Sequence, residues 1–410
     1  MSNPRVALRA ISAAMALLLG STLLPFAADA RSRPPRITAR AALVVDARDG
    51  HVLFRRAAHE RRPIASTTKL MIALLTLEHL GLRRRLSATP YQPGPAESVI
   101  GLSAGERMAV KDLLRALLLP SANDAAVTLA KGVTGSIRKF VRQMNRRAHE
   151  LGLAETHYAN PIGLDEARNF SSAFDLSRLA RRLLHNRTFA SIVKLPKARL
   201  HTGARPRVVV NRNDLVARVP WVNGVKTGHT AGAGYVLVGY GTQRGVRLVS
   251  VVLGEPSEGT RDSDTLALLQ YGFSFYRHVK VASTNQGIAK AHVRFYGDRT
   301  VSLVTPGIIN VALRPGERLH TRIDAPKTLE GPIERGTRVG TMTVFSDDRR
   351  VRVQPLVTAD RVPEAGFFRK AASHLGTVLL VALGLGAAAL VVRRRARREK
   401  SGTHRHRVVT

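Results

Sequence analysis

The sequence predicts an α+β domain followed by a small all-β domain and a C-terminal transmembrane helix. Apolar residues make up 44% of the 410 residues, which is enough for a folded core. Between residues 40 and 278, a helix-rich middle lies between strand-like segments, so an antiparallel sheet would be assembled from both ends of this region. From 279 to 358 only short strands and turns are expected. Eighteen consecutive residues without a charge, 375–392, form the predicted membrane span.

Local patterns predict the elements of the first domain. Residues 31–39 are rich in Arg and Pro and are expected to form a short disordered lead. Apolar stretches at 42–46 and 51–54 surround Asp49-Gly50, which indicates a hairpin. From Ser66 onward, apolar residues surround a helix on nearly every side, so this helix should be buried in the domain centre. The other predicted elements are helices at 110–119, 123–131, 136–151, 173–185 and 262–275, and strands at 235–240 and 247–253.

The second domain, residues 279–358, is expected to consist of strands separated by turns. It contains no recognisable catalytic constellation, so a stalk and a partner-docking module remain equally open. Its predicted strands are 291–295, 301–304, 310–313, 341–345 and 351–357.

The N-terminal residues have the pattern of a signal peptide. Arg5 and Arg9 precede an apolar run at 10–24, and Ala28-Asp29-Ala30 resembles a signal-peptidase site. The interpretation is a signal peptide at 1–30 and export of the mature chain. An uncleaved N-terminal anchor is the alternative, although the run is short for a span.

The C-terminal region predicts an anchor. After a linker at 359–374, the uncharged run 375–392 would span about 27 Å as a helix. The tail 393–410 begins with a cluster of arginines, so the positive-inside rule places it in the cytoplasm and the catalytic body outside. A buried core helix is the alternative for this run.

Composition excludes several kinds of protein. The absence of cysteine excludes disulfides, a thiol nucleophile and cysteine-ligated metals. The fourteen histidines form no metal-ligand motif, and no phosphate-binding loop occurs, so no metal or cofactor is expected. The net charge of +36 suggests nucleic-acid binding, but the chain has one Trp and no recognised DNA-binding motif. Scattered arginines favour solvated faces and attraction to an anionic cell surface or wall polymer, with no nucleic-acid partner.

Three short motifs stand in a fixed order. They are Ser66-x-x-Lys69, then Ser121-x-Asn123, then Lys-Thr-Gly at 226–228. Together they supply a hydroxyl nucleophile with an amine, a second hydroxyl with an amide, and a cationic strand edge. This set of groups is typical of serine acyl-transfer enzymes that use lysine as the proton acceptor.

The order of the motifs singles out Ser66. Ser136 with Lys139 and Ser191 with Lys194 also fit Ser-x-x-Lys, but no Ser-x-Asn follows either of them before the Lys-Thr-Gly motif. Ser66 and Lys69 would face the same side of a helix about one turn apart. The lysine can accept a proton only when it is neutral, which requires burial or nearby positive charge, and Lys226 could provide that charge. The Ser66 N–H could also serve as an oxyanion donor.

The chain resembles the serine-type D-alanyl-D-alanine carboxypeptidases, which are low-molecular-weight penicillin-binding proteins. Residues 62–71 are similar to the family's active-site helix and residues 120–126 to its second motif. The segments 160–164, 211–213 and 224–230 also match in order, and the resemblance covers about residues 40–358. It implies a β-lactamase/transpeptidase-like catalytic domain followed by a β-rich C-terminal domain.

The resemblance assigns roles to the second and third motifs. Ser121 would relay the proton to the leaving amine, and Asn123 would hold the substrate's amide. The alternative for Asn123 is a helix N-cap. Lys226 and Thr227 would bind the carboxylate of a peptide that ends in D-alanine.

Three further positions complete the implied site. Arg212 matches a family position that also contacts the carboxylate, although its gap to the Lys-Thr-Gly motif is a residue shorter than usual. Gly228 would let substrate approach the backbone of an edge strand. His229 would offer its backbone N–H as the second oxyanion donor, with no catalytic role for its side chain.

The implied function is removal of the terminal D-alanine from peptidoglycan stem peptides through an acyl-enzyme at Ser66, with β-lactam antibiotics as inhibitors that acylate the same serine. A β-lactamase or DD-endopeptidase on the same scaffold is an alternative, and Glu166 could activate water for deacylation in the former. Because Glu166 follows the carboxypeptidase-like segment 160–164, we expect a surface loop residue. A catalytically silent wall-binding protein is the alternative from another class.

Overall fold

A five-stranded antiparallel sheet organises the first domain of the computed structural model, which describes residues 33–95 and 97–401 without the side chains of 373–380 and 396–401. The predicted signal peptide, 1–30, therefore lies outside the described residues. The strand order is β2-β1-β9-β8-β7, so strands from both ends of the domain pair in one sheet, and β7 forms an edge. The strands are β1 (Ala41–Asp46), β2 (Val52–Arg56), β7 (Val222–Thr230), β8 (Gly234–Gln243) and β9 (Val246–Glu255).

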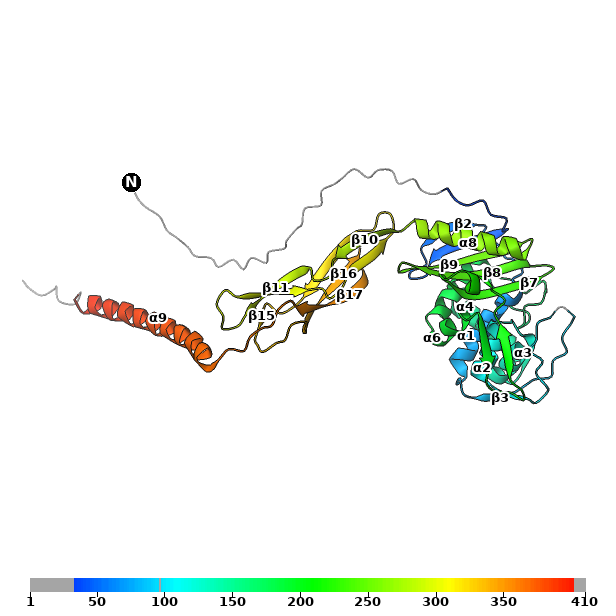
Figure 1. The fold of residues 1–410 in the computed structure, drawn as a ribbon, viewed down its shortest axis with the longest axis horizontal. Coiled ribbons are helices and arrows are strands. Elements are labelled where there is room, and N and C mark those ends of the chain that lie inside the picture. The colour runs from blue at the N-terminus through cyan, green and yellow to red at the C-terminus, as the bar shows by residue number, and fades with distance from the viewer. Residues whose placement is uncertain (1–32, 96, 402–410) are drawn as a thin grey trace, which may run out of the picture. The chain divides into compact units, whose positions relative to one another are not determined.

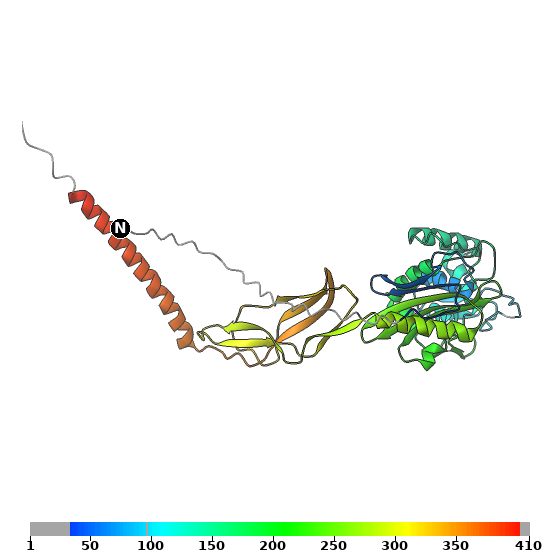
Figure 2. The same cartoon turned by 90° about the horizontal axis from the view of Figure 1, so that it is seen from above.

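Both faces of the sheet are covered by helices (Figures 1 and 2). Side chains alternate along β1, so Leu43 and Val45 pack into the helix cluster while Val44 packs on the opposite face with α8 (Glu258–Ser274). This two-sided burial explains why β1 is apolar at almost every position.

The helix cluster confirms the predicted helices with small shifts at their ends. Ser66 lies in a 3-10 turn, η1 (Ala65–Thr68), which leads into α1 (Lys69–His79). The first eight residues of α1 are all buried, as expected for a helix with apolar residues all round. The remaining helices are α2 (Val110–Leu118), α3 (Asn123–Thr134), α4 (Ile137–Glu150), α5 (Ala173–Leu184), α6 (Arg187–Val193) and α7 (Leu215–Arg218).

The expectation of a disordered lead at 31–39 is wrong for its second half. Ile37 and Ala39 are buried against the α8 side of the sheet. Thr38 donates its hydroxyl to Glu255 Oε2 at 2.6 Å and to Asp264 Oδ2 at 3.0 Å. Two distant acidic residues thus fix this segment, a nonlocal effect that composition does not reveal.

The C-terminal β-rich region has all five predicted strands and three more. Among the additional strands, β14 is half-buried or exposed at every position. Backbone pairing with β16, rather than a hydrophobic pattern, therefore defines β14. The strands are β10 (Arg277–Ala282), β11 (Gly287–Val293), β12 (Thr300–Val304), β13 (Ile309–Leu313), β14 (Leu319–Asp324), β15 (Thr328–Leu329), β16 (Arg338–Ser346) and β17 (Arg349–Thr358).

Two short ladders and one long helix complete the described chain. The ladders join β3 (Arg85–Ser87) to β4 (Arg107–Ala109) and β5 (Lys197–Leu200) to β6 (Arg207–Val210). Helix α9 (Phe367–Ser401) includes the predicted span 375–392. Among the residues described here, no helix is long and apolar enough to cross a membrane.

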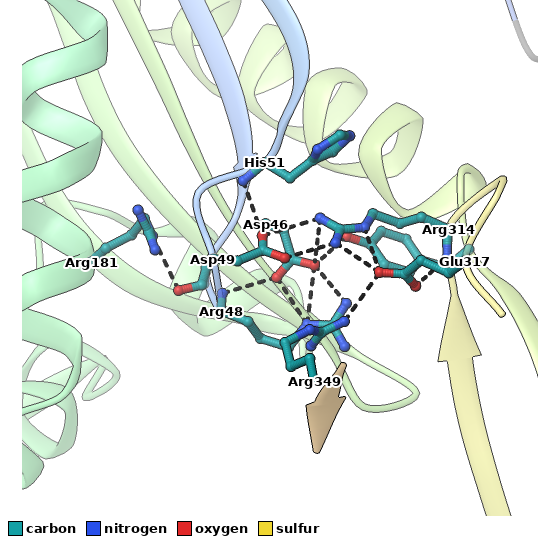
Figure 3. Close-up of polar contacts among 10 residues, drawn as sticks. Asp46, Arg48, Asp49, His51, Arg181, Arg314, Glu317 and Arg349 are labelled. Carbon is teal, nitrogen blue, oxygen red and sulfur yellow. Dashed lines mark hydrogen bonds and ion pairs between the residues drawn. The ribbon is translucent and has the colours of Figure 1, made fainter. Parts of the chain in front are cut away.

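A cluster of charged side chains surrounds the turn between β1 and β2 (Figure 3). Asp46 is fully buried and accepts hydrogen bonds from Arg48 Nη2 at 2.6 Å and from the Tyr276 hydroxyl at 2.6 Å. Arg314 Nη2 contacts Asp49 and Glu317, each at 2.7 Å. Burial opposes the charge of Asp46, but the hydrogen bonds from Arg48 and Tyr276 outweigh it and lower the pKa of Asp46.

Asp46→Ala is expected to lower the free energy of unfolding by about 3–5 kcal/mol, because it leaves the charge of Arg48 unpaired in a largely buried place. The lowered pKa means that this stabilisation is present above the pKa of an unfolded Asp and is lost as pH falls through the folded pKa. Urea unfolding measures both effects. Asp49→Ala, at a more exposed ion pair, is the matched control and should cost about 1 kcal/mol or less. Equal costs for the two variants would contradict the expectation.

Candidate active site

Ser66 and Lys69 are in direct contact. Lys69 Nζ lies 2.8 Å from Ser66 Oγ and 2.8 Å from the carbonyl oxygen of Ile162, and the Lys69 side chain is fully buried. The 3-10 turn followed by α1 places the amine one turn from the hydroxyl, as the spacing predicts. A neutral amine at this distance can accept the hydroxyl proton.

The surroundings of Lys69 favour its neutral form. Burial is the largest influence and lowers the pKa, the charge of Glu97 raises it, and the charge of Arg212 lowers it, for a result of about 7. The sequence prediction named Lys226 as the source of positive charge. The structure gives this role to burial and Arg212, while the charge of Lys69 in turn lowers the pKa of Lys226.

Two glycines allow the backbone to approach Ser66 closely. A Cβ added to Gly228, on the edge strand β7, would lie 2.8 Å from Ser66 N. A Cβ added to Gly163 would lie 2.1 Å from the carbonyl oxygen of Ala65. Ala65 itself has a φ of 46°, a strained conformation for a residue with a side chain. The Ser66 N–H thus lies beside the β7 edge with little room for any side chain.

His229 follows Gly228 on the same edge. Its imidazole is exposed and stacks on Tyr235 with ring centroids 4.0 Å apart. The side chain therefore has a structural partner, which agrees with the expectation that only the backbone of His229 matters.

The second motif lies between α2 and α3. Ser121 has a φ of 67°, and its buried Oγ has no hydrogen-bond partner among the described residues. Asn123 is the first residue of α3, whereas Ala122 occupies the N-cap, so the N-cap alternative for Asn123 is wrong. Its Nδ2 donates instead to Glu97 Oε2 at 2.7 Å.

The groups predicted to bind a carboxylate lie near the two catalytic candidates. Lys226 is 1% exposed, and its Nζ donates to the carbonyl oxygen of Thr227 at 2.8 Å. Burial, followed by the charges of Lys69, Arg212 and Arg261, lowers its pKa well below the ordinary lysine value. Burial thus disfavours the charge of the predicted cationic edge in the free site, and a bound anion would favour it. Arg212 Nε donates to the carbonyl oxygen of Pro120 at 3.2 Å, beside Ser121.

Glu166 lies on an exposed loop, as predicted. Its Oε1 accepts a hydrogen bond from Asn160 Nδ2 at 2.7 Å. Asn160 Oδ1 accepts from the backbone N–H of Gly163 at 2.7 Å, so this asparagine shapes the turn that approaches Ser66. Glu166 therefore takes part in a loop contact, rather than in the contact between Ser66 and Lys69.

Known proteins match this chain over nearly its whole described length. The sequence profile of D-alanyl-D-alanine carboxypeptidases matches residues 28–257, more than half of the chain. The chain belongs to this family. In this carboxypeptidase, residues 276–364 match the C-terminal domain of penicillin-binding protein 5.

Relatives and solved structures agree with the family. The chain is 30% identical to the D-alanyl-D-alanine carboxypeptidase DacF of Bacillus subtilis, over 86% of this chain and 94% of the relative. It is 31% identical to DacC of Escherichia coli, over 88% and 93%. Penicillin-binding protein 5 of Haemophilus influenzae has a similar structure, with 27% identity, a TM-score of 0.56 and coverage of 81% and 100%. A DD-transpeptidase of Streptomyces shares 32% identity, a TM-score of 0.56 and coverage of 59% and 100%.

These matches confirm the resemblance. The chain has a mixed α/β penicillin-binding, transpeptidase-like fold with a C-terminal β domain. It is a serine peptidase that acts as a D-alanyl-D-alanine carboxypeptidase, and the β-lactamase, endopeptidase and silent-protein alternatives are not favoured.

Sequence reasoning missed Glu97 and Tyr91, which contact Asn123 and each other. Both lie in the long connection between β3 and β4, where no motif marks them. A single glutamate in a Pro- and Gly-rich loop cannot be recognised from the sequence as part of a site, because only the fold places it beside a motif.

Proposed function

We propose that this carboxypeptidase removes the terminal D-alanine from peptidoglycan stem peptides through an acyl-enzyme at Ser66. The observation that carries the proposal is the 2.8 Å contact between Ser66 Oγ and the Nζ of a fully buried Lys69. A pKa of about 7 for Lys69 leaves a large share of the amine neutral at physiological pH, so it can act as the base.

In acylation, Ser66 Oγ attacks the carbonyl carbon of the penultimate D-alanine while Lys69 takes the hydroxyl proton. The developing oxyanion accepts hydrogen bonds from the backbone N–H groups of Ser66 and His229. Ser121 relays a proton to the leaving amine as the peptide bond breaks and free D-alanine departs. Water then attacks the ester, and Ser66 regains its proton.

Substrate is held on both sides of the scissile bond. Asn123 hydrogen-bonds the peptide amide, while Lys226, Thr227 and Arg212 bind the terminal carboxylate. Penicillins enter the same site and acylate Ser66, which makes them inhibitors. Trimming the stem peptides in this way removes donors for cross-linking of the cell wall.

Labelling with a fluorescent penicillin tests the assignment. We expect one adduct, mapped to Ser66 by peptide analysis and absent from Ser66→Ala. Ser136→Ala is the matched control, because Ser136 also begins a Ser-x-x-Lys sequence but lies just before α4, and it should label normally. An adduct on Ser136 or Ser191, or no adduct on folded protein, would overturn the proposal.

We also propose that the mature chain begins near Arg31, outside the cytoplasm, and is anchored by residues 375–392. The support is the uncharged run followed by Arg393, Arg394 and Arg395, the flank that the positive-inside rule places in the cytoplasm. In this proposal the domain at 40–278 carries the catalysis and the region 279–358 separates it from the membrane.

A chain that ends at Ala372 should move from the membrane fraction to the soluble fraction and still react with penicillin, because it lacks the proposed span. A chain that ends at Ser401 keeps the span and is the control that should remain with the membrane. Centrifugation followed by penicillin labelling measures both properties. Retention of the shorter chain in membranes would reveal another anchor.

A further inference from the structure

Glu97 connects a loop to the second motif. Its carboxylate accepts hydrogen bonds from Asn123 Nδ2, at 2.7 Å, and from the Tyr91 hydroxyl. Both donors reach the same oxygen, Oε2. Because Asn123 is only 5% exposed, its hydrogen bond with Glu97 is not a contact between two surface side chains.

The backbone holds this loop in place beside α3. The N–H of Asn123 donates to the carbonyl oxygen of Ser98 at 2.7 Å. The Asp124 carboxylate accepts from the N–H groups of Ile100, at 3.2 Å, and Leu102, at 3.0 Å. The first turn of α3 thus forms hydrogen bonds with the backbone of residues 98–102, and Glu97 immediately precedes this segment.

The chemistry of the pair fixes the orientation of the Asn123 amide. An ionised carboxylate only accepts hydrogen bonds, so the NH₂ end of Asn123 must face Glu97. The second N–H of Nδ2 and the carbonyl Oδ1 are then left for a bound peptide, whose amide offers one acceptor and one donor. An asparagine free to rotate would present these groups in other directions.

Glu97 is also the negative charge that acts on Lys69. The groups that act on Lys69 are Glu97 from the loop and Arg212 from the segment before α7, and Lys69 acts in turn on Lys226 of β7. Burial opposes ionisation of Glu97, but the hydrogen bonds from Tyr91 and Asn123 and the charge of Lys69 outweigh it and lower its pKa. Glu97 is therefore charged when Lys69 titrates.

We infer that Glu97 is a positioning residue for the reaction, which holds the Asn123 amide in one orientation at the substrate site. This inference deepens the proposed function and rests on its assignment of Ser66 and Lys69. Glu97 touches neither substrate nor reacting atoms in this role, since it acts through Asn123 and Lys69.

Two variants separate the two effects. Glu97→Gln can still accept from Asn123 but lacks the charge, so the protonated form of Lys69 loses a stabilising neighbour. The acidic limb of the pH–rate profile for acylation of Ser66 should then move to lower pH, by about half a pH unit or more. Glu97→Ala removes the hydrogen bond as well, so kcat/KM for the peptide at the plateau should also fall by about tenfold.

Glu166→Gln is the matched control, because it neutralises an exposed loop glutamate that contacts Asn160, and its profile should coincide with that of the wild type. Acylation rates with a fluorescent penicillin give the profile, and thermal unfolding checks that each variant is folded. A Glu97→Gln limb that stays at the wild-type pH would overturn the charge effect, and a plateau for Glu97→Ala equal to the wild type would overturn the positioning of Asn123. If the proposed acyl-enzyme function itself were wrong, the wild-type protein would form no penicillin adduct on Ser66, which is a different result from either of these.

Discussion

Lys69→Met should slow acylation of Ser66 by penicillin by about a hundredfold or more, because it removes the general base and leaves the hydroxyl as a weak nucleophile. Methionine is similar to lysine in length and suits a fully buried position, so the fold should survive the change. The measurement is the rate of adduct formation at saturating and subsaturating penicillin, together with a denaturation curve for each protein.

The pH dependence makes this expectation specific. Only neutral Lys69 can take the proton, so acylation by the wild type should rise with pH through a midpoint near 7, the pKa of Lys69. Lys69→Met should lack this limb altogether. Lys139→Met is the control, since Lys139 belongs to the competing Ser136-x-x-Lys139 pattern but is exposed on α4. If the acylation rate of Lys69→Met still rose with pH through a midpoint near 7, the titrating group would be a residue other than Lys69.

Local sequence patterns predicted the parts of the site that chain geometry fixes. The spacing of Ser66 and Lys69 requires contact on a helical turn, and the structure has that contact. The Lys-Thr-Gly motif was expected on an edge strand, and β7 is the last strand of its sheet. The burial of α1 followed from apolar residues on all its faces. The first and the third of these inferences need only neighbours in sequence, whereas the edge strand belongs to the site that the family resemblance implies.

Parts that depend on nonlocal contacts were not predictable. Arg212, rather than Lys226, adds the positive charge that lowers the pKa of Lys69, since the fold brings the segment before α7 to the site. Glu97 reaches Asn123 from a loop without regular structure. Thr38 is fixed by Asp264, more than two hundred residues away. No pattern within a short window carries this information.

A peptide that ends in a free carboxylate should be cleaved about 10 to 100 times faster, in kcat/KM, than the same peptide with a C-terminal amide. The reason is the loss of a charge-assisted hydrogen bond, which contributes about 1.5–3 kcal/mol. Burial disfavours the charge of Lys226 in the free site, and a bound carboxylate favours that charge. A neutral amide has no charge to offer in return.

Arg212→Ala should narrow this preference for the acid, because Arg212 lies beside Ser121 and its charge reaches both lysines of the site. Arg199→Ala, on an exposed position of β5, is the control and should leave the preference unchanged. Release of D-alanine from the acid and of D-alaninamide from the amide measures both rates in one assay. If the wild type cleaved the two peptides equally, the assignment of Lys226, Thr227 and Arg212 to carboxylate binding would be wrong. If Arg212→Ala kept the full preference for the acid, Lys226 and Thr227 alone would bind the carboxylate.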